Sequence, residues 1–162
     1  MYKLLLIIAM MTLWLSVHLI QIEDELAMKT LFQSKRAVNR AVHAAAQQLD
    51  KTSLSEGELR IDPTAAAAAA FEYLQRNLQL DASNNPQNTS FLEEQVEVLV
   101  FDIINSDESF PYFYHNDSYL YDAVLNKPGV VMIIHVAFPN RFPVLEPMEW
   151  SVKGVSEIVL DL

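Results

Sequence analysis

The chain contains no cysteine, which excludes disulfides, thiolate nucleophiles and zinc-thiolate sites together. Glycine occurs only 3 times among 162 residues, so little material exists for a glycine-rich phosphate-binding loop. The first glycine is Gly57 and the first proline is Pro63, so residues 1–56 lack the residues that most often interrupt a helix. These absences favour one long N-terminal helix and a protein without a common catalytic motif.

Basic residues are also scarce, because 11 Lys and Arg stand against 21 Asp and Glu, for a formal net charge of -10. Several of the cations fall in the N-terminal part, at Lys29, Lys35, Arg36 and Arg40. The remainder is therefore even more acidic than the total suggests, and an acidic surface repels phosphate backbones. The composition predicts no nucleic-acid partner.

Residues 4–22 form an apolar run whose polar members are Thr12, Ser16, His18 and Gln21. Its length matches the roughly 20 apolar residues of a membrane-spanning helix. A cleavable signal peptide is the alternative, but no A-x-A-like site precedes the acidic triplet at residues 23–25. We therefore expect a retained membrane-spanning helix.

The apolar run continues into an alanine-rich stretch in which apolar residues recur at helical spacing. A helix over residues 2–50 would measure roughly 70 Å, about twice the thickness of a bilayer core, so half of it lies outside lipid. We expect residues 1–50 to form a transmembrane helix that continues into an amphipathic stalk helix. Residues 51–162 are then expected to form a small α+β extracytoplasmic domain with a single core.

Small residues mark two candidate faces for helix packing on this N-terminal helix. In the apolar run, Ala9, Thr12 and Ser16 lie at i, i+3 and i+7. This spacing lets another helix approach closely, but it also arises by chance. The other face lies in the stalk, where it could pack against the alanine run at residues 65–70; high helix propensity alone is the alternative explanation. The candidate packing and assembly residues are Ala9, Thr12, Ser16, Ala41, Ala44 and Ala45.

Residues 51–58 are expected to form a loop, after which Asp62-Pro63 predicts an N-cap followed by proline at the first helical position. A second, alanine-rich helix then extends to about residue 78. Residues 81–90 are rich in Asn, Ser and Pro and predict a loop.

Strand signals fill the C-terminal half of the chain. Alternation over 93–105 predicts one strand, and the apolar run 130–138 is typical of a central strand. A last strand over 149–162 places Trp150, Val152, Val155, Ile158 and Leu160 on one face only if Gly154 absorbs a bulge. The expected fold is α+β: a long membrane and stalk helix, an alanine-rich helix, and a small antiparallel sheet of three or four strands.

An aromatic segment lies between these strands and predicts either a short strand or a loop. Its side chains would form a recognition surface, because aromatic residues give much contact area at low entropic cost, or a cover for a small core. The residues concerned are Phe110, Tyr112, Tyr114, Tyr119 and Tyr121.

The histidines lie too far apart for a compact metal motif, and His135, within an apolar strand, is expected to be a packed core residue. Acidic residues between 107 and 122 favour a solvated edge over a calcium site, because the spacing of an EF-hand loop is missing. No nucleophile elbow, zinc-protease motif or phosphate loop occurs. We expect no catalytic residues, no cofactor and no metal.

The sequences LFQ at 31–33 and AAAQQL at 44–49 resemble the stretch that follows the membrane helix in TadE/TadG-like proteins of tight-adherence pilus systems. The order of elements also resembles pilins and pseudopilins. The opening Met1-Tyr2-Lys3-Leu4-Leu5 departs from the prepilin pattern of a glycine-terminated leader followed by an early glutamate. The resemblance implies a non-enzymatic subunit of an envelope filament or secretion apparatus, which self-associates through its N-terminal helix.

A single-pass binding or sensor module with an aromatic recognition surface is the alternative function. For either function, Lys3 and the amino terminus favour a cytoplasmic N-terminus, whereas the cations of the stalk favour the reverse orientation. Because the acidic triplet comes first at the membrane boundary, we expect the N-terminus in the cytoplasm and the C-terminal domain outside it.

Overall fold

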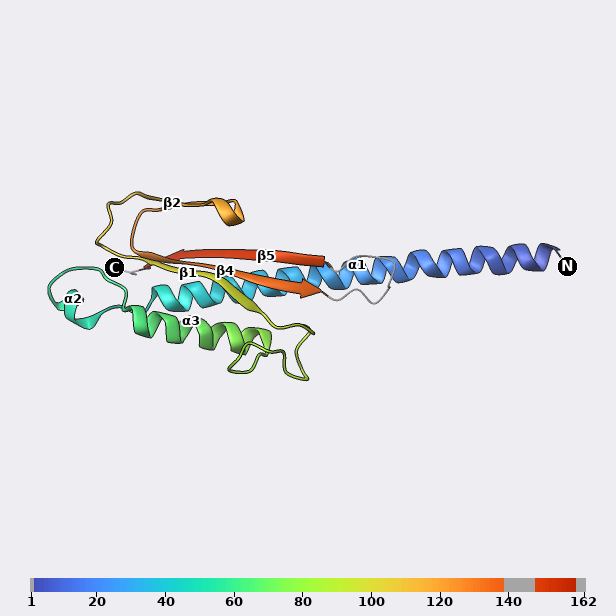
Figure 1. Cartoon of the computed structure of the whole chain (residues 1–162), viewed down its shortest axis with the longest axis horizontal. Helices are drawn as coiled ribbons and strands as arrows, with labels where there is room; N and C mark the ends of the chain where they lie inside the picture. Colours follow the sequence, from blue (N-terminus) through green and yellow to red (C-terminus); the bar gives the residue numbers. More distant parts are fainter. Residues whose placement is uncertain (1, 139–147, 160–162) are drawn as a thin grey trace.

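The computed structural model describes residues 2–138 and 148–159. One unbroken helix, α1 (Tyr2–Ala46), extends from the N-terminal tip of the molecule and runs along most of the folded part (Figure 1). The expected long helix is confirmed, because its sequence contains neither glycine nor proline.

The helix α1 has two parts that differ in their surroundings. Every residue from 2 to 22 is exposed, and we call this part the free helix. From Glu23 onward, one stripe at helical spacing is buried: Glu23, Ala27, Thr30, Ser34, Ala37, Val38, Ala41, Val42, Ala45 and Ala46. The second part of α1 is therefore a core element of the folded part, which we call the head.

Two shorter helices follow α1. Asp50 caps α2 (Lys51–Ser55), which occupies part of the expected loop and buries none of its residues. Asp62 caps α3 (Pro63–Leu78) by accepting from the backbone N–H groups of Thr64 and Ala65, and proline occupies the first turn, as expected. Helix α3 packs along α1 through Ala66, Ala70, Leu74 and Leu78.

The main sheet is antiparallel, with the order β1-β4-β5. Its strands are β1 (Glu97–Ile104), β4 (Gly129–Phe138) and β5 (Met148–Glu157), and the central β4 is buried at every position except His135. The expected α+β fold and antiparallel pairing are confirmed. The last residues of the expected third strand, 160–162, lie outside the described residues.

Gly154 forms no bulge, so the condition for placing Val155 on the same face as Val152 is not met. Strand β5 pairs with β4 in continuous register, with Gly154 opposite Met132, and the irregularity lies in β1 between Val98 and Val100. Without a bulge, Val155 points to the opposite face from Val152 and is partly exposed.

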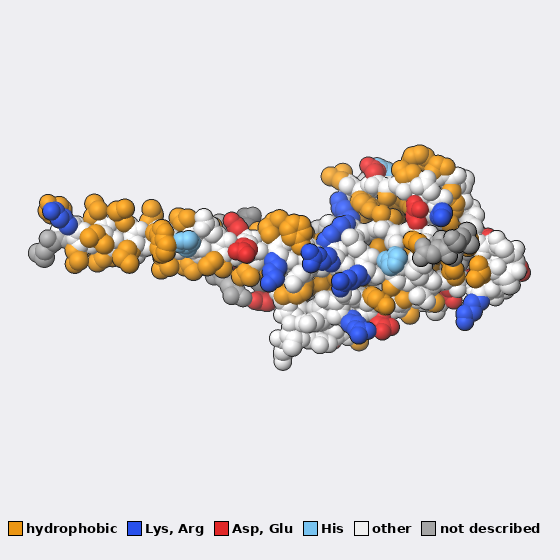
Figure 2. Space-filling view, turned by 180° about the vertical axis from the view of Figure 1, so that it is seen from behind, with side chains coloured by type: hydrophobic (Ala, Val, Ile, Leu, Met, Phe, Trp, Pro, Cys, Tyr) orange, Lys and Arg blue, Asp and Glu red, His pale blue; other side chains and the backbone are white. Residues whose placement is uncertain are grey.

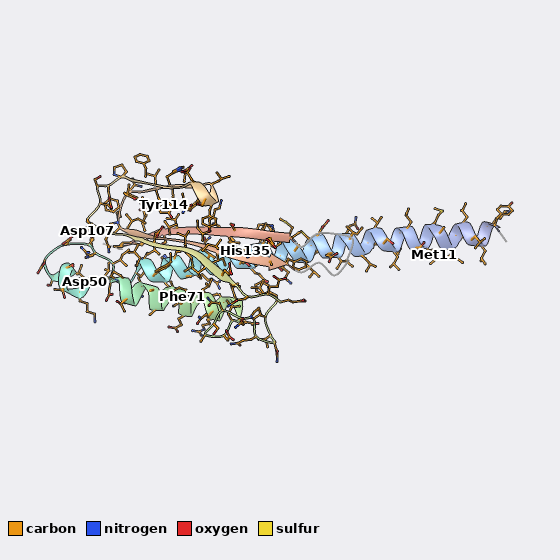
Figure 3. All side chains as sticks on the ribbon, viewed as in Figure 1. Met11, Asp50, Phe71, Asp107, Tyr114 and His135 are labelled. Atoms are coloured by element: carbon orange, nitrogen blue, oxygen red, sulfur yellow. The ribbon has the colours of Figure 1, made fainter. Side chains whose placement is uncertain are left out.

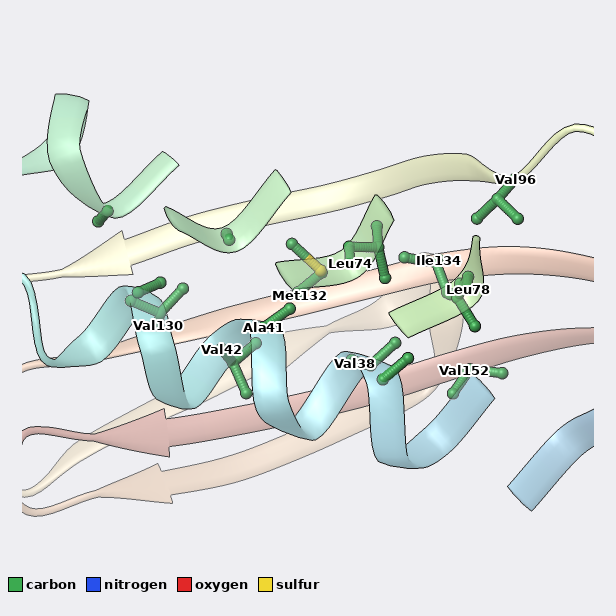
Figure 4. Close-up of a cluster of buried hydrophobic side chains, with 14 of the residues drawn as sticks. Val38, Ala41, Val42, Leu74, Leu78, Val96, Val130, Met132, Ile134 and Val152 are labelled. Carbon is green, nitrogen blue, oxygen red and sulfur yellow. The ribbon is translucent and has the colours of Figure 1, made fainter. Parts of the chain in front are cut away.

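The head is built in three layers, with α1 and α3 on one face of the sheet and a hairpin on the other (Figure 1). The hairpin consists of β2 (Tyr112–Asn116), the short 3-10 turn η1 (Asp117–Tyr119) and β3 (Tyr121–Leu125). Between helices and sheet lies the larger core, in which side chains of α1, α3 and β4 converge (Figure 4). Its residues include Val38, Ala41, Val42, Leu74, Leu78, Met132 and Ile134.

The second part of α1 and the residues after position 50 share one core. Residues 37–46 of α1 contribute buried side chains to the larger core, so they pack as part of the head. Burial of α1 begins at Glu23, and α3, β4 and β5 all contact the helix. A head lacking these residues would expose the apolar faces of β4 and α3 to water.

Candidate functional site

The most exposed apolar surface of the described residues is the free helix. Exposed large hydrophobic side chains occur at most positions from Leu4 to Ile22, and Figure 2 shows them covering one side of the helix, with a basic side chain near its tip. Met11, for example, projects away from all other elements (Figure 3). The helix is long and apolar enough to span a membrane, and the corresponding segment is 0% buried in the molecule. An exposed apolar surface of this size marks a site of contact with lipid or with another protein.

The candidate packing residues of the free helix have their polar groups satisfied locally. The Thr12 hydroxyl donates to the carbonyl of Ala9 at 2.9 Å, and the Ser16 hydroxyl donates to the carbonyl of Thr12 at 2.9 Å. These bonds remove the cost of placing a hydroxyl in hydrocarbon. All three residues stay exposed, so this face is available to another helix.

The candidate packing residues of the second part of α1 have a different position. Ala41 and Ala45 are completely buried within the chain's own core, and Ala44 is partly buried. Their small side chains face the region where α1 packs against α3, whose Ala66 and Ala70 are also buried. Ala41 and Ala45 therefore serve the packing of the head and offer no surface to another copy.

Cations line the exposed side of α1 just beyond the free helix. Lys35 donates to the carbonyl of Lys153 on β5, and its partial burial lowers the pKa of its amine. Lys29, Arg36 and Arg40 lie at i, i+7 and i+11, on one face of the helix, and we call them the basic stripe. Figure 2 shows Lys and Arg side chains gathered where the free helix meets the head.

The basic stripe borders a groove between α1 and the segment after α3. Two adjoining hollows of about 420 and 280 Å³ share Gln33, Gln79 and Phe91 as lining residues. Lys29 lines the first hollow, and Arg36 and Arg40 line the second. We call this the basic groove. It is a positively charged depression on a protein of strongly negative net charge.

One cation of the basic groove is held in place by a hydrogen bond. Nη1 of Arg40 donates to Oδ1 of Asn77, near the end of α3, at 2.8 Å. The Asn77 amide in turn donates to the carbonyl of Tyr73 at 2.6 Å. A guanidinium has several further donors, so this contact orients Arg40 and leaves donors for a carboxylate.

The aromatic residues expected as a recognition surface mainly cover a second core. Tyr114 is buried between the hairpin and the sheet (Figure 3), together with Ile104, Leu125 and Val131. Phe110, Tyr112 and Tyr121 are partly buried against the same cluster. The Tyr114 hydroxyl donates to Asp102 at 2.7 Å, and burial together with this bond raises its pKa. Tyr119 lies in the turn η1 and is also partly buried.

The outward face of the hairpin carries different apolar residues from those expected. Phe113 is 72% exposed and pairs across the hairpin with Val124, and Leu120 at the turn is 86% exposed. The sequence contained a signal for this outcome, because alternation over residues 112–116 puts Phe113 on the face opposite Tyr112 and Tyr114. Which of the two faces packs against the sheet depends on how the hairpin folds onto it.

His115 lies beside Phe113 on this outward face, between two carboxylates. Its Nδ1 contacts Asp122, and its Nε2 lies 2.8 Å from Oδ1 of Asp117. The hydrogen bonds to Asp122 and Asp117 raise the pKa of His115. The arrangement is on the surface and not in a cavity, which is typical of an ion-pair cluster.

His135 was expected to be a packed core residue, but the structure leaves it partly exposed. Its side chain is 31% exposed, and Nε2 lies 3.3 Å from a carboxylate oxygen of Glu149 on β5. The reason is alternation in β4: His135 and Val131 share the face toward the hairpin, and the hairpin cluster covers only Val131. Among the described residues, no group of three or more His, Asp or Glu is placed to hold a metal ion.

Comparison of the chain with models of protein families, with curated proteins and with solved structures finds no match.

Proposed function

We propose that the chain is a non-enzymatic, membrane-anchored, pilin-like structural subunit of an envelope filament or secretion apparatus. The observation that carries this proposal is the free helix, which is exposed around its whole circumference and continues without interruption into the core of the head. The resemblance of residues 31–33 and 44–49 to TadE/TadG-like proteins supports the same conclusion.

The continuity of α1 is what an assembled subunit requires. A binding module on a spacer needs only a flexible tether, whereas here the helix that leaves the lipid is also the helix that carries Val38 and Val42 into the core. A force on the free helix is therefore transmitted directly to the folded head. The partners in this proposal are the membrane and other copies or related subunits, which contact the free helix through Ala9, Thr12 and Ser16.

In this proposal, the chain is a single-pass protein of the cell membrane. Its N-terminus lies in the cytoplasm with Lys3, and its head lies on the extracytoplasmic side. The acidic residues that begin at Glu23 then mark the boundary between lipid and water. Nucleic acid is not a partner, because the head is acidic.

The proposal is tested by enlarging the small face of the free helix in the full chain. Ala9→Leu, Thr12→Leu and Ser16→Leu together prevent close approach of a second helix, so we expect self-association in detergent or bilayers to fall at least tenfold. Met11→Phe, which adds volume on the opposite side of the helix, is the matched control and should associate like the wild type. Single-molecule photobleaching counts the copies directly, and undiminished association of the triple variant contradicts the proposal.

An extracytoplasmic binding or sensor module is a second candidate, favoured by the exposed apolar pair Phe113 and Val124. Such a module would use the hairpin face, and Phe113→Ser would then abolish capture of its ligand from envelope extracts without changing self-association. In the structural-subunit proposal, the same substitution leaves assembly intact and removes no ligand.

A further inference from the structure

Charges on the exposed side of α1 are arranged in two blocks of opposite sign. Asp24 and Glu25 are exposed at the end of the free helix, and the basic stripe follows from Lys29 to Arg40. Glu25, Lys29 and Arg36 lie at i, i+4 and i+11, so Glu25 shares one helix face with the basic stripe, while Asp24 projects from an adjacent side of the helix. Phe32, at i+7 on the same face, is 57% exposed and adds an apolar contact.

The order of the two blocks determines how two parallel copies of α1 fit together. Copies placed at the same level set acidic block against acidic block and basic stripe against basic stripe, which is repulsive. At about 1.5 Å per residue, Lys29 lies roughly 6 Å and Arg40 roughly 22 Å beyond Glu25 along the helix axis. A displacement within this range brings the acidic block of one copy to the basic stripe of the next.

A membrane surface fits the basic stripe less well than a second copy does. Arg40 lies roughly 27 Å along the helix beyond Ile22, at about 1.5 Å per residue. Electrostatic attraction between exposed charges extends only about 8 Å at physiological ionic strength. In addition, Asp24 and Glu25 lie between the lipid and the stripe, and they would repel anionic headgroups.

We propose that the basic groove receives the Asp24–Glu25 block of a second copy, whose α1 lies parallel to the first and is displaced by about 6–22 Å along the helix axis. This inference rests on the proposed function and adds to it a second partner surface, on the side of α1 opposite Ser16, together with the stagger. The oriented guanidinium of Arg40 and the neighbouring Arg36 pair with the incoming carboxylates.

The proposed contact is heterologous, because one copy contributes its acidic block and the other contributes its basic groove. Because Glu25 and the basic stripe lie on one helix face, the two copies turn this face toward each other and form a staggered pair. Two copies inserted to the same depth in one bilayer do not have this displacement. The contact therefore belongs to the assembled state, and copies resting in the membrane are held apart by their like charges.

Engineered cysteines in the full chain test the stagger, since the natural sequence contains no cysteine. In one chain, Glu25→Cys and Arg36→Cys lie roughly 16 Å apart along the helix, too far for the roughly 7 Å limit of an internal disulfide. In detergent solution, where copies slide freely, oxidation of the double variant should give disulfide-linked dimers. Each single variant should give almost none.

Charge reversal provides an independent measurement. Arg36→Glu with Arg40→Glu should weaken self-association at least tenfold, as should Asp24→Lys with Glu25→Lys, and mixing the two variants should restore dimers between them. Lys51→Glu with Arg76→Glu changes the charge equally outside the groove and should have no effect.

The outcomes separate this inference from the proposed function. Disulfide dimers of Glu25→Cys alone show level packing and overturn the stagger, while the protein still self-associates. If neither charge reversal changes self-association, the basic groove is not the contact between copies, and the proposed function still stands. A chain that is monomeric by photobleaching in every variant, the wild type included, overturns the proposed function itself.

Discussion

Gly154 of β5 lies directly against Val38 of α1, so that a Cβ placed on residue 154 would come within 2.5 Å of Val38 Cγ1. The missing side chain is what lets the helix and the sheet approach closely at this point. Glycine is therefore required here by packing between layers and not by a turn or a bulge.

Gly154→Ala should destabilise the head by roughly 1–3 kcal/mol, because valine is stiff at χ1 and cannot move its methyl group away cheaply. Chemical denaturation of the full chain in detergent, followed by circular dichroism, measures the change. Combining Gly154→Ala with Val38→Ala removes the clash, so the two costs should not add. Simple additivity would show that the contact is looser than described.

Asp62→Ala should cost roughly 0.5–2 kcal/mol, because the carboxylate caps α3, whose buried residues form part of the larger core. The thermal unfolding midpoint is the measurement. Asp50→Ala is the matched control, since Asp50 caps α2 in the same way but α2 buries no residue. Equal effects of the two substitutions would contradict a special role of the α3 cap in stability.

Asn105→Ala should destabilise the head by roughly 1–3 kcal/mol, because it leaves buried backbone groups without partners. The Asn105 side chain accepts from the Ile61 N–H at 2.8 Å and donates to the Ile61 carbonyl at 3.1 Å. Denaturant unfolding compares this variant with Asn88→Ala, the same change at an exposed site. If both variants have the same free energy of unfolding as the wild type, the hydrogen bonds between Asn105 and Ile61 contribute nothing to stability.

His115 should titrate above the usual pKa of histidine, owing to its hydrogen bonds with Asp122 and Asp117. Because the folded-state pKa is raised, the stabilisation of the hairpin is complete below the unfolded-state pKa and is lost as the pH rises through the folded-state value. Nuclear magnetic resonance of the His115 ring follows the titration. Asp122→Asn should lower this pKa, whereas Asp81→Asn, far from the hairpin, should leave it unchanged.

Much of the fold was predictable because its signals are local. Absence of glycine and proline predicts α1, Asp62-Pro63 predicts the start of α3, and the apolar run of β4 predicts a central strand. These features depend on backbone sterics and short-range hydrogen bonds, which a few adjacent residues specify. The capping of α2 by Asp50 is also local but was hidden in a segment expected to be a loop.

The candidate sites were predictable only in part. Alternation separates Tyr112 and Tyr114 from Phe113 but does not say which set faces the sheet, because that depends on the distant strand β4. Likewise, the cations of α1 are visible in the sequence, whereas the groove beside them requires Gln79 and Phe91 from beyond α3.

By itself, the sequence determined the elements of this protein and the apolar character of its first residues, since helix periodicity, caps and membrane-length runs arise between near neighbours along the chain. Only the tertiary structure decided that α1 is free up to Ile22 and buried on one stripe from Glu23 onward. The physical reason is that burial depends on which distant elements cover a surface. That division leaves one half of the helix to lipid or partners and places Ala41 and Ala45 in the core.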